Sequence, residues 1–409
     1  MLSLPFLNLK KSKDLENSFL GITFDSLRVN VVYFEISSDE LNPIVQVKCI
    51  ISRFIGEKVE NLFKEYSDDS ALIETLRVIL TELSEKFPDV SNQVIFGLSA
   101  DKCIDLMSIV SLENSVRRRF TEEQVAELDE QAYKNASFRA QDALATQIGD
   151  MESDLDLITS VDVFKKLDGI VTRDPIGLEG EKLEQAWFGS FVRRADLERF
   201  KQIAKKLNLK ILTVSSLNYA FYTCLTQHDP KYSNCIVVNL DNDLTQVSAA
   251  FGGSIVGSRF INIGLVSVLN EISSRLGLYP DEALEVLEKY RQGTLDPSLA
   301  QGVQKIIYRF FVIWSKALGE VFSDFSGIKT FSSNVVLVGP GFDLPDLHMF
   351  TSSEPWFKSI PFKAPPNFEK GLASDKITKV SDLTGKASLS AWSLPISLSG
   401  VYVRMKDTS

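Results

Sequence analysis

The residues best suited to chemistry surround a predicted turn in the second half of the chain. The run Cys235–Leu240 is apolar and rich in β-branched residues, as in a buried strand, and Leu244–Phe251 predicts a second strand. Between them, Asp241–Asp243 places two carboxyl groups and one amide in a turn. Together with the hydroxyl groups of Thr245 and Ser26, these oxygen atoms are of the type that binds Mg²⁺ and its phosphate partners.

Two interpretations of this turn are open. In the first, Asp243, Thr245 and Ser26 hold a magnesium–phosphate group. In the second, Asp241–Asp243 is a hairpin turn made of good turn formers, with no ligand. The sequence favours the second interpretation, because two carboxylates beside a polyphosphate would repel it by on the order of several kcal/mol where water is partly excluded.

Glycines mark the elements that would position such a site. The pair Gly252–Gly253 is a hairpin signal that leads into a third strand, and Gly264 precedes a predicted helix that ends at Gly277. Two further glycines, Gly339 and Gly341, follow a later buried strand. Gly339 either contacts a ligand or lets a strand and a helix pack closely, and the sequence leaves both interpretations open.

Composition narrows the classes of function. The 409 residues, 44% hydrophobic and 24% charged, predict an ordinary globular protein of two or three domains. A net charge of −10 argues against a nucleic-acid partner. The four cysteines form no CxxC motif and are expected to be reduced, which suits the cytoplasm. With only two histidines, we predict no metal site and no histidine-based triad.

The first half predicts a mixed α/β arrangement. The segment Leu20–Glu35 is typical of a β-hairpin, and Asp69–Phe87 has the apolar spacing of an amphipathic helix. Two strands and a long helix that begins with a capping box at Thr121 come next. A strand at Lys182–Val192 then precedes a helix at Ala195–Leu207. This order predicts a small domain inserted in a larger one.

The second half combines the central hairpin with helices. Pro280–Gln292 and Ser298–Phe325 predict two helices, and Ala391–Val403 fits either a helix or a strand. Residues 352–387 have little periodicity and several prolines, so we expect an irregular surface crossing there. The element order predicts a flexible tail at 1–18, a first-lobe core at 19–92 and 194–215, an inserted domain at 93–193, a second-lobe core at 216–272 and 331–404, a helical subdomain at 273–330 and a tail at 405–409.

Two motifs carry a family resemblance. Asp174–Leu178, followed by Gly180 and Leu183–Glu184, is similar to the motif DPIG-x-x-G-x-x-LE of the bacterial cell-division protein FtsA. Gly339–Leu347 is similar to the adenosine motif of the same actin-like ATPase superfamily. The chain resembles FtsA over residues 19–404 and, more distantly, the pilus-assembly protein PilM. The resemblance implies an α/β, actin-like two-lobed fold of duplicated ribonuclease-H-like domains, with a small α+β domain inserted in the first lobe.

The resemblance also implies an ATP site, and here the chain departs from the family pattern. The family's first phosphate motif has an acid, a glycine and a lysine, where this chain has Thr23–Ser26 and Asn30. No glycine of the family's second phosphate motif is present in Asn239–Gln246. ATP and Mg²⁺ are therefore expected to bind weakly or not at all. The resemblance assigns the cofactor to Thr23, Ser26, Asp243, Thr245, Gly264, Gly339 and Gly341.

These features together predict an FtsA-like scaffold of bacterial cell division with no ATPase activity or a very weak one. The expected partners are an FtsZ-like division protein or further copies of the chain in a protofilament. One alternative is a polymerising ATPase of the same family. Another is a PilM-like adaptor that binds a short peptide in the groove of the inserted domain. We expect a cytoplasmic protein at the inner face of the membrane, which it contacts indirectly or through Met1–Lys13.

Overall fold

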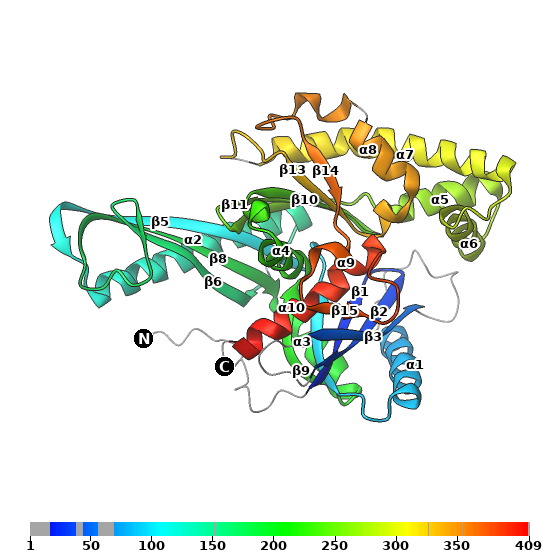
Figure 1. Cartoon of the computed structure of the whole chain (residues 1–409), viewed down its shortest axis with the longest axis horizontal. Coiled ribbons are helices and arrows are strands. Elements are labelled where there is room, and N and C mark those ends of the chain that lie inside the picture. Colours follow the sequence, from blue (N-terminus) through cyan, green and yellow to red (C-terminus); the bar gives the residue numbers. More distant parts are fainter. Residues whose placement is uncertain are drawn as a thin grey trace.

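Two β-sheets organise the chain, whose computed structural model describes residues 17–37, 44–55, 69–150, 153–325, 327–353 and 355–407. Each sheet belongs to one of two bodies that lie against each other, and a long arm projects from their side (Figure 1). The segment Met1–Lys13, expected to contact a membrane, lies outside the described residues. Within the described residues, no helix combines the length and the apolar character needed to cross a bilayer.

The six-stranded sheet has the order β15-β3-β2-β1-β4-β9. Strands β1, β2 and β3 are antiparallel, which confirms the hairpin predicted at Leu20–Glu35, and β4 and β9 continue the sheet parallel to β1. Helices α1 (Ser70–Lys86) and α3 (Arg194–Lys206) cover one face through a shared apolar core. The strands are β1 Ser18–Phe24, β2 Arg28–Ile36, β3 Val45–Phe54, β4 Gln93–Leu98, β9 Lys210–Ser216 and β15 Val380–Asp382.

The nine-stranded sheet has the order β14-β13-β10-β11-β12-β5-β8-β6-β7. Its centre is the predicted hairpin stretch, in which β10, β11 and β12 form an antiparallel meander. Strand β12 meets β5 at one pair, Gly257 opposite Leu106. The strands are β5 Cys103–Arg119, β6 Leu155–Leu167, β7 Ile170–Thr172, β8 Glu179–Arg193, β10 Cys235–Leu240, β11 Thr245–Phe251, β12 Ser254–Ile261, β13 Asn334–Val338 and β14 Asn367–Lys370.

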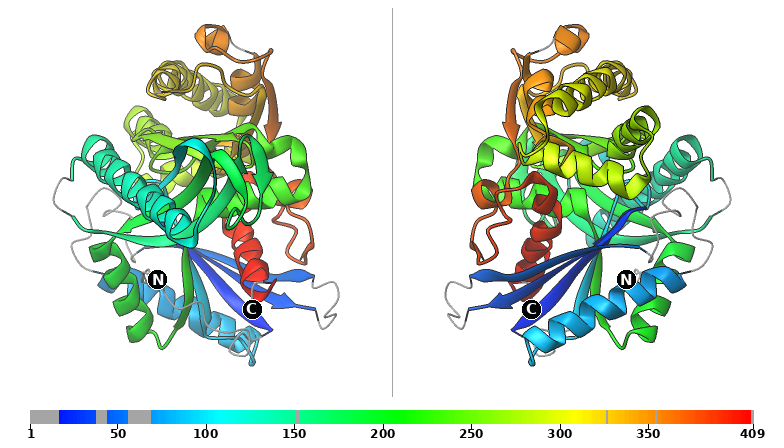
Figure 2. Two further views of the ribbon diagram at one scale, coloured as in Figure 1. Left: turned by 90° about the vertical axis from the view of Figure 1, so that its left-hand side faces the viewer. Right: turned by 90° about the vertical axis from the view of Figure 1, so that its right-hand side faces the viewer.

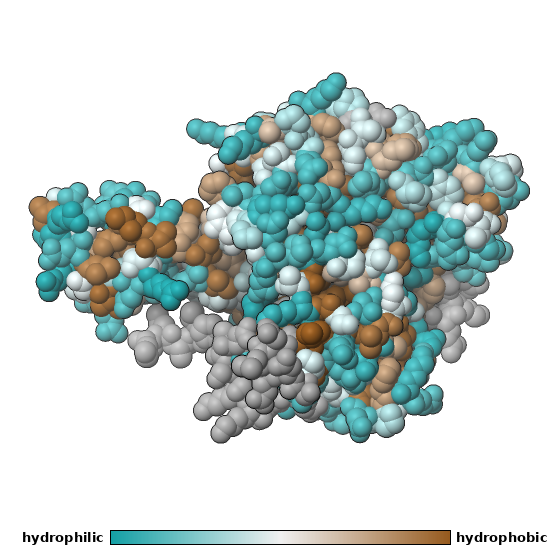
Figure 3. All heavy atoms as spheres, in the orientation of Figure 1, coloured by the Kyte–Doolittle hydropathy of each residue, from teal (hydrophilic) through white to brown (hydrophobic). Residues whose placement is uncertain are grey.

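The arm consists of β5, β6, β7 and β8 with helix α2 (Glu122–Ile148) packed on them. Helix α2 begins with the predicted capping box, in which the Thr121 side chain accepts from the Gln124 amide and the Gln124 side chain accepts from the Thr121 amide. Figure 3 shows apolar residues gathered on the surface of the arm. The exposed apolar side chains of the arm include Ile109, Val116, Phe138, Val161, Ile170, Val171, Ile176 and Leu178.

Helices cover the central strands of the nine-stranded sheet. Helix α5 (Leu265–Leu276) follows β12, and the two predicted helices are present as α6 (Pro280–Arg291) and α7 (Pro297–Ser323). Helix α8 (Pro345–Ser353) packs against α7. The apolar core between these helices and the sheet has Trp314 of α7 at its centre, stacked among phenylalanines. The helical prediction for this region is confirmed, and the predicted domain boundaries stay predictions.

Two helices lie between the sheets. Helices α4 (Leu217–His228) and α10 (Ser393–Asp407) share one apolar core with Phe34 of β2 and Val237 of β10, and Figure 2 shows α10 alongside the six-stranded sheet. The uncertain segment Ala391–Val403 is therefore mainly helical. The described residues of 352–387 form a mainly irregular crossing of mostly exposed or half-buried residues, as expected, and the short elements β14, α9 (Ala373–Lys376) and β15 interrupt it.

Candidate functional site

Two hairpin turns from the two sheets bind each other directly. One turn joins β1 to β2 and the other joins β10 to β11. The backbone amide of Ser26 donates to Oδ2 of Asp243 at 2.8 Å, and the Ser26 hydroxyl donates to Oδ1 of the same carboxylate. The side-chain amide of Asn242 donates to Oδ2 of Asp25 at 2.9 Å. The two turns are thus joined by three hydrogen bonds at the place where the resemblance puts the phosphates.

Each turn is shaped by its own aspartate. Oδ1 of Asp25 accepts from the amides of Leu27 and Arg28 at 2.7 and 2.8 Å, which folds the first turn locally. Oδ1 of Asp241 accepts from the Asn242 amide at 2.8 Å. The Asp25 carboxylate therefore serves both its own turn and the contact between the sheets, whereas the Asp241 carboxylate serves its own turn.

The start of helix α5 is also engaged by the second turn. The amide of Leu265 donates to the carbonyl of Asp241 at 3.0 Å, and the amide of Val266 donates to the carbonyl of Asn242 at 2.9 Å. Amides at a helix N-terminus are the usual donors to a bound phosphate group. Here the protein backbone occupies two of them, so the helix offers correspondingly less to an anion.

The carboxyl groups crowd one another at this contact. Burial and the nearby Asp243 carboxylate raise the pKa of Asp25 to about 6, against the lowering effect of the Asn242 hydrogen bond. Burial and the Asp25 carboxylate raise the pKa of Asp241 to about 7. The raised pKa values mean that ionised carboxylates are disfavoured here. A triphosphate bound beside these turns would add negative charge to a site in which ionised carboxylates are already energetically unfavourable.

The glycines assigned to the cofactor let the protein pack against itself. A Cβ on Gly264 would meet the carbonyl of Asn242, and one on Gly341 would meet the side chain of Leu240. Gly339 has a φ of 101°, which favours glycine, and a Cβ there would meet the Asn239 side chain and the Leu240 carbonyl. Of the two interpretations of Gly339, these contacts favour close packing.

The threonines assigned to the cofactor point into the protein. Thr245 is fully buried; its hydroxyl donates to the carbonyl of Ile263 at 2.6 Å and accepts from Nε1 of Trp314 at 2.8 Å. Thr23 is 4% exposed and its methyl group lies against Gly97. Of the seven predicted positions, the structure brings Ser26 and Asp243 together through side-chain contact. The role of these positions as nucleotide ligands stays a prediction, and the arrangement disfavours it.

A cavity of about 360 Å³ lies beside the joined turns. Its positive side chains already have partners: Arg28 lies over the ring of Phe54, 4.5 Å from its centroid, and Arg291 pairs with Glu288 at 2.8 Å. Lys386 lies 5.4 Å from the ring centroid of Trp392. These residues do not fit the triphosphate of ATP, because the phosphate-facing backbone is occupied and the nearest turns are acidic. In the described part of the chain, no cluster of three or more His, Cys, Asp or Glu side chains could hold a metal ion.

Sequence reasoning found the loss of the phosphate ligands but missed the contact that replaces them. Ser26 and Asp243 are separated by 217 positions, so no local pattern links them. The signal that could have found the contact is the complementary composition of the two turns. One offers a hydroxyl and a carboxylate, and the other offers a carboxylate and an amide, so each has both a donor and an acceptor for its counterpart.

Comparisons with known proteins establish the fold. No family model matches the sequence, and no curated protein matches it. The structure titled "PilM-PilN type IV pilus biogenesis complex" aligns with a TM-score of 0.63 and 14% identity, covering 95% of this chain and 98% of that chain. This likeness shows that the chain has the actin-like two-lobed α/β fold. The FtsA family in particular gains no support from it.

Two weaker likenesses have lower scores. The ethanolamine utilization protein EutJ of Carboxydothermus hydrogenoformans aligns at TM-score 0.45 and 10% identity, over 94% of this chain and 90% of that chain. MreB5 of Spiroplasma citri bound to ADP aligns at TM-score 0.44 and 10% identity, over 96% of this chain and 98% of that chain. Scores at this level carry no conclusion about what this chain binds.

Proposed function

We propose that this chain is a PilM-like adaptor: an actin-like scaffold that binds protein partners and does not turn over ATP. The direct bond between the turns at Ser26 and Asp243 carries the proposal, because protein groups meet at the position that the resemblance assigns to a nucleotide's phosphates. The likeness to the PilM–PilN complex supports the choice of PilM over FtsA. The protein would work in the cytoplasm, beside the membrane that carries its partners.

The electrostatics of the contact favour a scaffold over an enzyme. An ATPase needs donors and cations that stabilise developing negative charge on the transferred phosphoryl group. This chain has Asp25, Asp241 and Asp243 at the two joined turns. The raised pKa values of Asp25 and Asp241 indicate that additional negative charge at these turns would be unfavourable. The chain therefore combines a two-lobed shape with turns whose carboxyl groups do not suit a phosphate.

Calorimetric titration of the full chain with Mg–ATP tests the nucleotide half of the proposal. We expect no heat of binding at protein concentrations that would detect a dissociation constant in the micromolar range. The variant Asp243→Gly, which removes one carboxylate and one partner of Ser26, serves as the matched comparison. Micromolar binding by the wild type, or ATP hydrolysis above background, would contradict the proposal and favour the polymerising ATPase.

Affinity purification of the tagged full chain from its native cells tests the partner half. The expected result is recovery of inner-membrane pilus-assembly proteins, identified by mass spectrometry. A second candidate function, an FtsA-like division scaffold, is favoured by the motif at Asp174–Leu178, whose turn is held to the arm by a bond from the Gly177 amide to the Phe120 carbonyl at 2.8 Å. Recovery of an FtsZ-like division protein without pilus proteins would reverse our choice.

A further inference from the structure

A groove with a volume of about 1080 Å³ lies between the arm and strands β11 and β12 of the nine-stranded sheet. It is well away from the joined turns and about three times larger than the cavity beside them, which measures about 360 Å³. Residues of β5 and α2 line it on the side of the arm, and residues of β11 and β12 line it on the other side. The segment 327–334, which leads into β13, closes the third side.

One wall of the groove is a strand edge. Strand β5 pairs with β12 only at Leu106, and from there onward it pairs with β8 on its other side. Among the described residues, no strand lies beside the outer edge of β5 from Met107 onward. Such an edge presents backbone donors and acceptors to an added strand. Arg139 of α2 reaches this edge and donates to the Met107 carbonyl at 2.7 Å.

Apolar side chains stand next to that edge. Ile109 of β5 is 57% exposed and Phe251 of β11 is 70% exposed, and both line the groove with Met107 and Val256. An extended peptide directs alternate side chains to the same face, so one set could lie on these residues while its backbone pairs with β5. Exposed aromatic and aliphatic residues beside an open strand edge are typical of a protein-binding surface.

The rim of the groove is positively charged. Its lining includes Arg139, Lys231, Arg259, Lys329 and Lys363 and contains no aspartate or glutamate. This is unusual in a chain with a net charge of −10. The charge of the side chains that line the groove therefore differs in sign from the net charge of the chain, which favours a negatively charged occupant.

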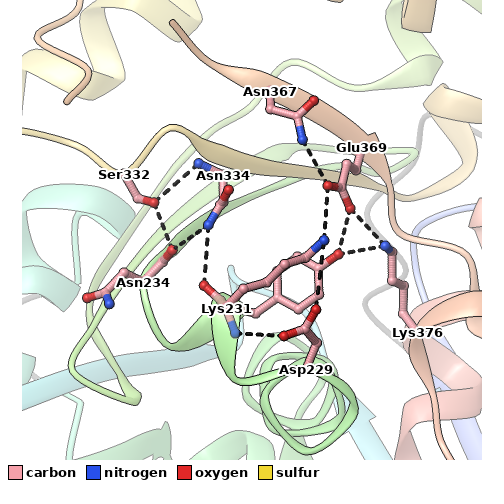
Figure 4. A network of polar contacts seen from close by, with 9 residues as sticks. Asp229, Lys231, Asn234, Ser332, Asn334, Asn367, Glu369 and Lys376 are labelled. Atoms are coloured by element: carbon pink, nitrogen blue, oxygen red, sulfur yellow. Dashed lines mark hydrogen bonds and ion pairs between the residues drawn. The ribbon is translucent and has the colours of Figure 1, made fainter. Parts of the chain in front are cut away.

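The cations differ in how far they are already neutralised. Figure 4 shows Lys231 inside a polar network, where its ammonium pairs with Glu369 at 3.3 Å. Arg259 lies over the ring of Phe325, and it interacts at longer range with Asp324 and Asp142, which do not line the groove. Lys329 and Lys363 are exposed and form no ion pair with another described residue.

The floor of the groove is held in place by the same network. The carbonyl of Asn234 accepts from the Ser332 hydroxyl at 2.7 Å and from the Asn334 side chain at 3.4 Å, which ties the start of β10 to the start of β13 (Figure 4). The amide of Lys363 donates to the Phe331 carbonyl at 2.8 Å. A preformed groove loses little conformational entropy when a ligand enters.

From these observations we propose that the groove binds an acidic, extended segment of a partner protein as an added strand beside β5. The proposal rests on the proposed adaptor function, and it names the surface and the chemistry of the partner segment. Acidic side chains would face Lys329 and Lys363, and apolar side chains between them would contact Ile109 and Phe251. The chain's own N-terminal Met1–Lys13 does not suit the groove, because its charged residues are lysines.

The test begins with random peptides displayed on phage and selected on the full chain, each long enough to form a strand of about 6 residues. Selected peptides are then synthesised with a fluorescent label and titrated by anisotropy. We expect alternation of Asp or Glu with apolar residues, and affinity that falls as salt is added. The double variant Lys329→Glu/Lys363→Glu should bind about tenfold more weakly or worse.

Two further variants separate the groove from general effects. Lys305→Glu/Lys316→Glu changes the same charge at exposed lysines of α7 outside the groove and should bind like the wild type. Phe251→Ser removes an apolar contact at a side chain that is 70% exposed, so it should fold normally and still lose affinity. Equal binding by the groove variant and the α7 variant, or selection of no acidic peptide, would overturn the proposal.

The outcome is distinguishable from failure of the adaptor function itself. If tagged wild type and the Lys329→Glu/Lys363→Glu variant recover the same pilus proteins and no acidic peptide binds, the groove proposal fails while the adaptor function stands. If anionic lipid vesicles bind the wild type and are lost with the groove variant while no peptide is selected, the groove recognises lipid and our proposal is wrong. Loss of partner recovery in the groove variant alone supports it.

Discussion

At the scale of single residues, three carboxyl groups, those of Asp25, Asp241 and Asp243, crowd the contact between the two hairpin turns. Asp25 and Asp241 have raised pKa values because burial and mutual repulsion disfavour their ionised forms. Asp243 is compensated by two donors from Ser26. Hydrogen bonds therefore stabilise the contact, whereas repulsion between its carboxylates destabilises it. Because this repulsion depends on ionisation, the stability of the contact should depend on pH.

The first prediction concerns Asp241→Asn. A folded-state pKa raised from 3.8 to about 7 means that the stabilisation is complete below pH 4 and is lost as the pH rises through about 7. The neutral variant keeps an oxygen for the Asn242 amide and avoids this loss. We expect it to be more stable than the wild type by on the order of 1–2 kcal/mol at pH 8, after allowance for solvent screening.

Thermal unfolding of both proteins at pH 4 and pH 8 provides the measurement. The advantage of Asp241→Asn should be clear at pH 8 and nearly absent at pH 4. Asp89→Asn, a change at an exposed turn residue, is the control and should show no such pH dependence. An equal advantage at both pH values would mean that charge repulsion is not the cause.

At the scale of elements, local patterns predicted most of the fold. The β10–β11–β12 meander, the capping box of α2 and the helices α6 and α7 follow from turn residues and apolar spacing within short windows. Strand β15 could not be found this way, because its three residues become a strand only by pairing with the edge of β3. The continuity of the nine-stranded sheet was equally hidden, since one pair at Gly257 and Leu106 creates it.

The candidate site was predictable only in part, for a related reason. The loss of phosphate-binding glycines can be read from Asn239–Gln246 alone. The bond from Ser26 to Asp243 depends on how two sheets approach each other, and the commitment of Thr245 to Trp314 depends on helix α7. Thr245 is therefore inaccessible to a ligand because its side chain points into the core, which the sequence pattern of the strand does not reveal.

The second prediction concerns the junction between the arm and the six-stranded sheet. Asp105 of β5 is 3% exposed and accepts from the hydroxyl of Ser190 in β8 at 2.6 Å and from the hydroxyl of Ser216, which caps α4. Asp105→Ala leaves both buried hydroxyls without this acceptor, so we expect a loss of about 2–3 kcal/mol in the free energy of unfolding. Urea denaturation measures it; a change below about 0.5 kcal/mol, the usual range of surface substitutions, would refute the assignment.

The third prediction concerns strand β14, which Glu369 ties to the segment before β10. Burial raises the pKa of Glu369, but hydrogen bonds from Lys376 and Tyr232 outweigh it and lower the pKa to about 2 (Figure 4). The stabilisation is therefore present above the ordinary pKa of 4.5 and is lost as the pH falls toward 2. Glu369→Gln should lower stability by on the order of 1–2 kcal/mol at pH 7 after discount for partial exposure.

Unfolding of the wild type and Glu369→Gln between pH 7 and pH 3 checks this prediction. The difference between the two proteins should shrink as the pH falls, because protonation removes the same charge that the substitution removes. Asn367→Ala removes a neutral partner of Glu369 on the same strand and provides a comparison without a change in charge. A difference that stays constant across the range would show that packing, and not charge, holds β14.

At the scale of the whole molecule, the actin-like shape is present and its two lobes are joined by protein groups. The bonds that join the two turns are formed by residues of the chain itself, so the contact between the lobes does not depend on a bound ligand. We therefore expect the two-lobed body to hold one arrangement whether or not ATP is present, which suits a scaffold.

The fourth prediction follows from that joint. The Ser26 amide, which donates to Asp243 at 2.8 Å although the residue is exposed, should exchange its hydrogen slowly with solvent. Asp243→Ala should speed this exchange, and Mg–ATP should leave the wild-type rate unchanged. Hydrogen exchange resolved at single residues gives the answer. Further protection of the Ser26 region by Mg–ATP would instead indicate that nucleotide closes the lobes.

The single pair that joins β12 to β5 has a mechanical consequence. A pulling force applied at the tip of the arm would run along β5 and β8, and only one backbone pair, Gly257 and Leu106, connects these strands with β12 and the rest of the nine-stranded sheet. Most of the force would arrive at Asp105, where the arm is fastened beside Ser216. A partner that pulled on the arm would therefore load the six-stranded body first.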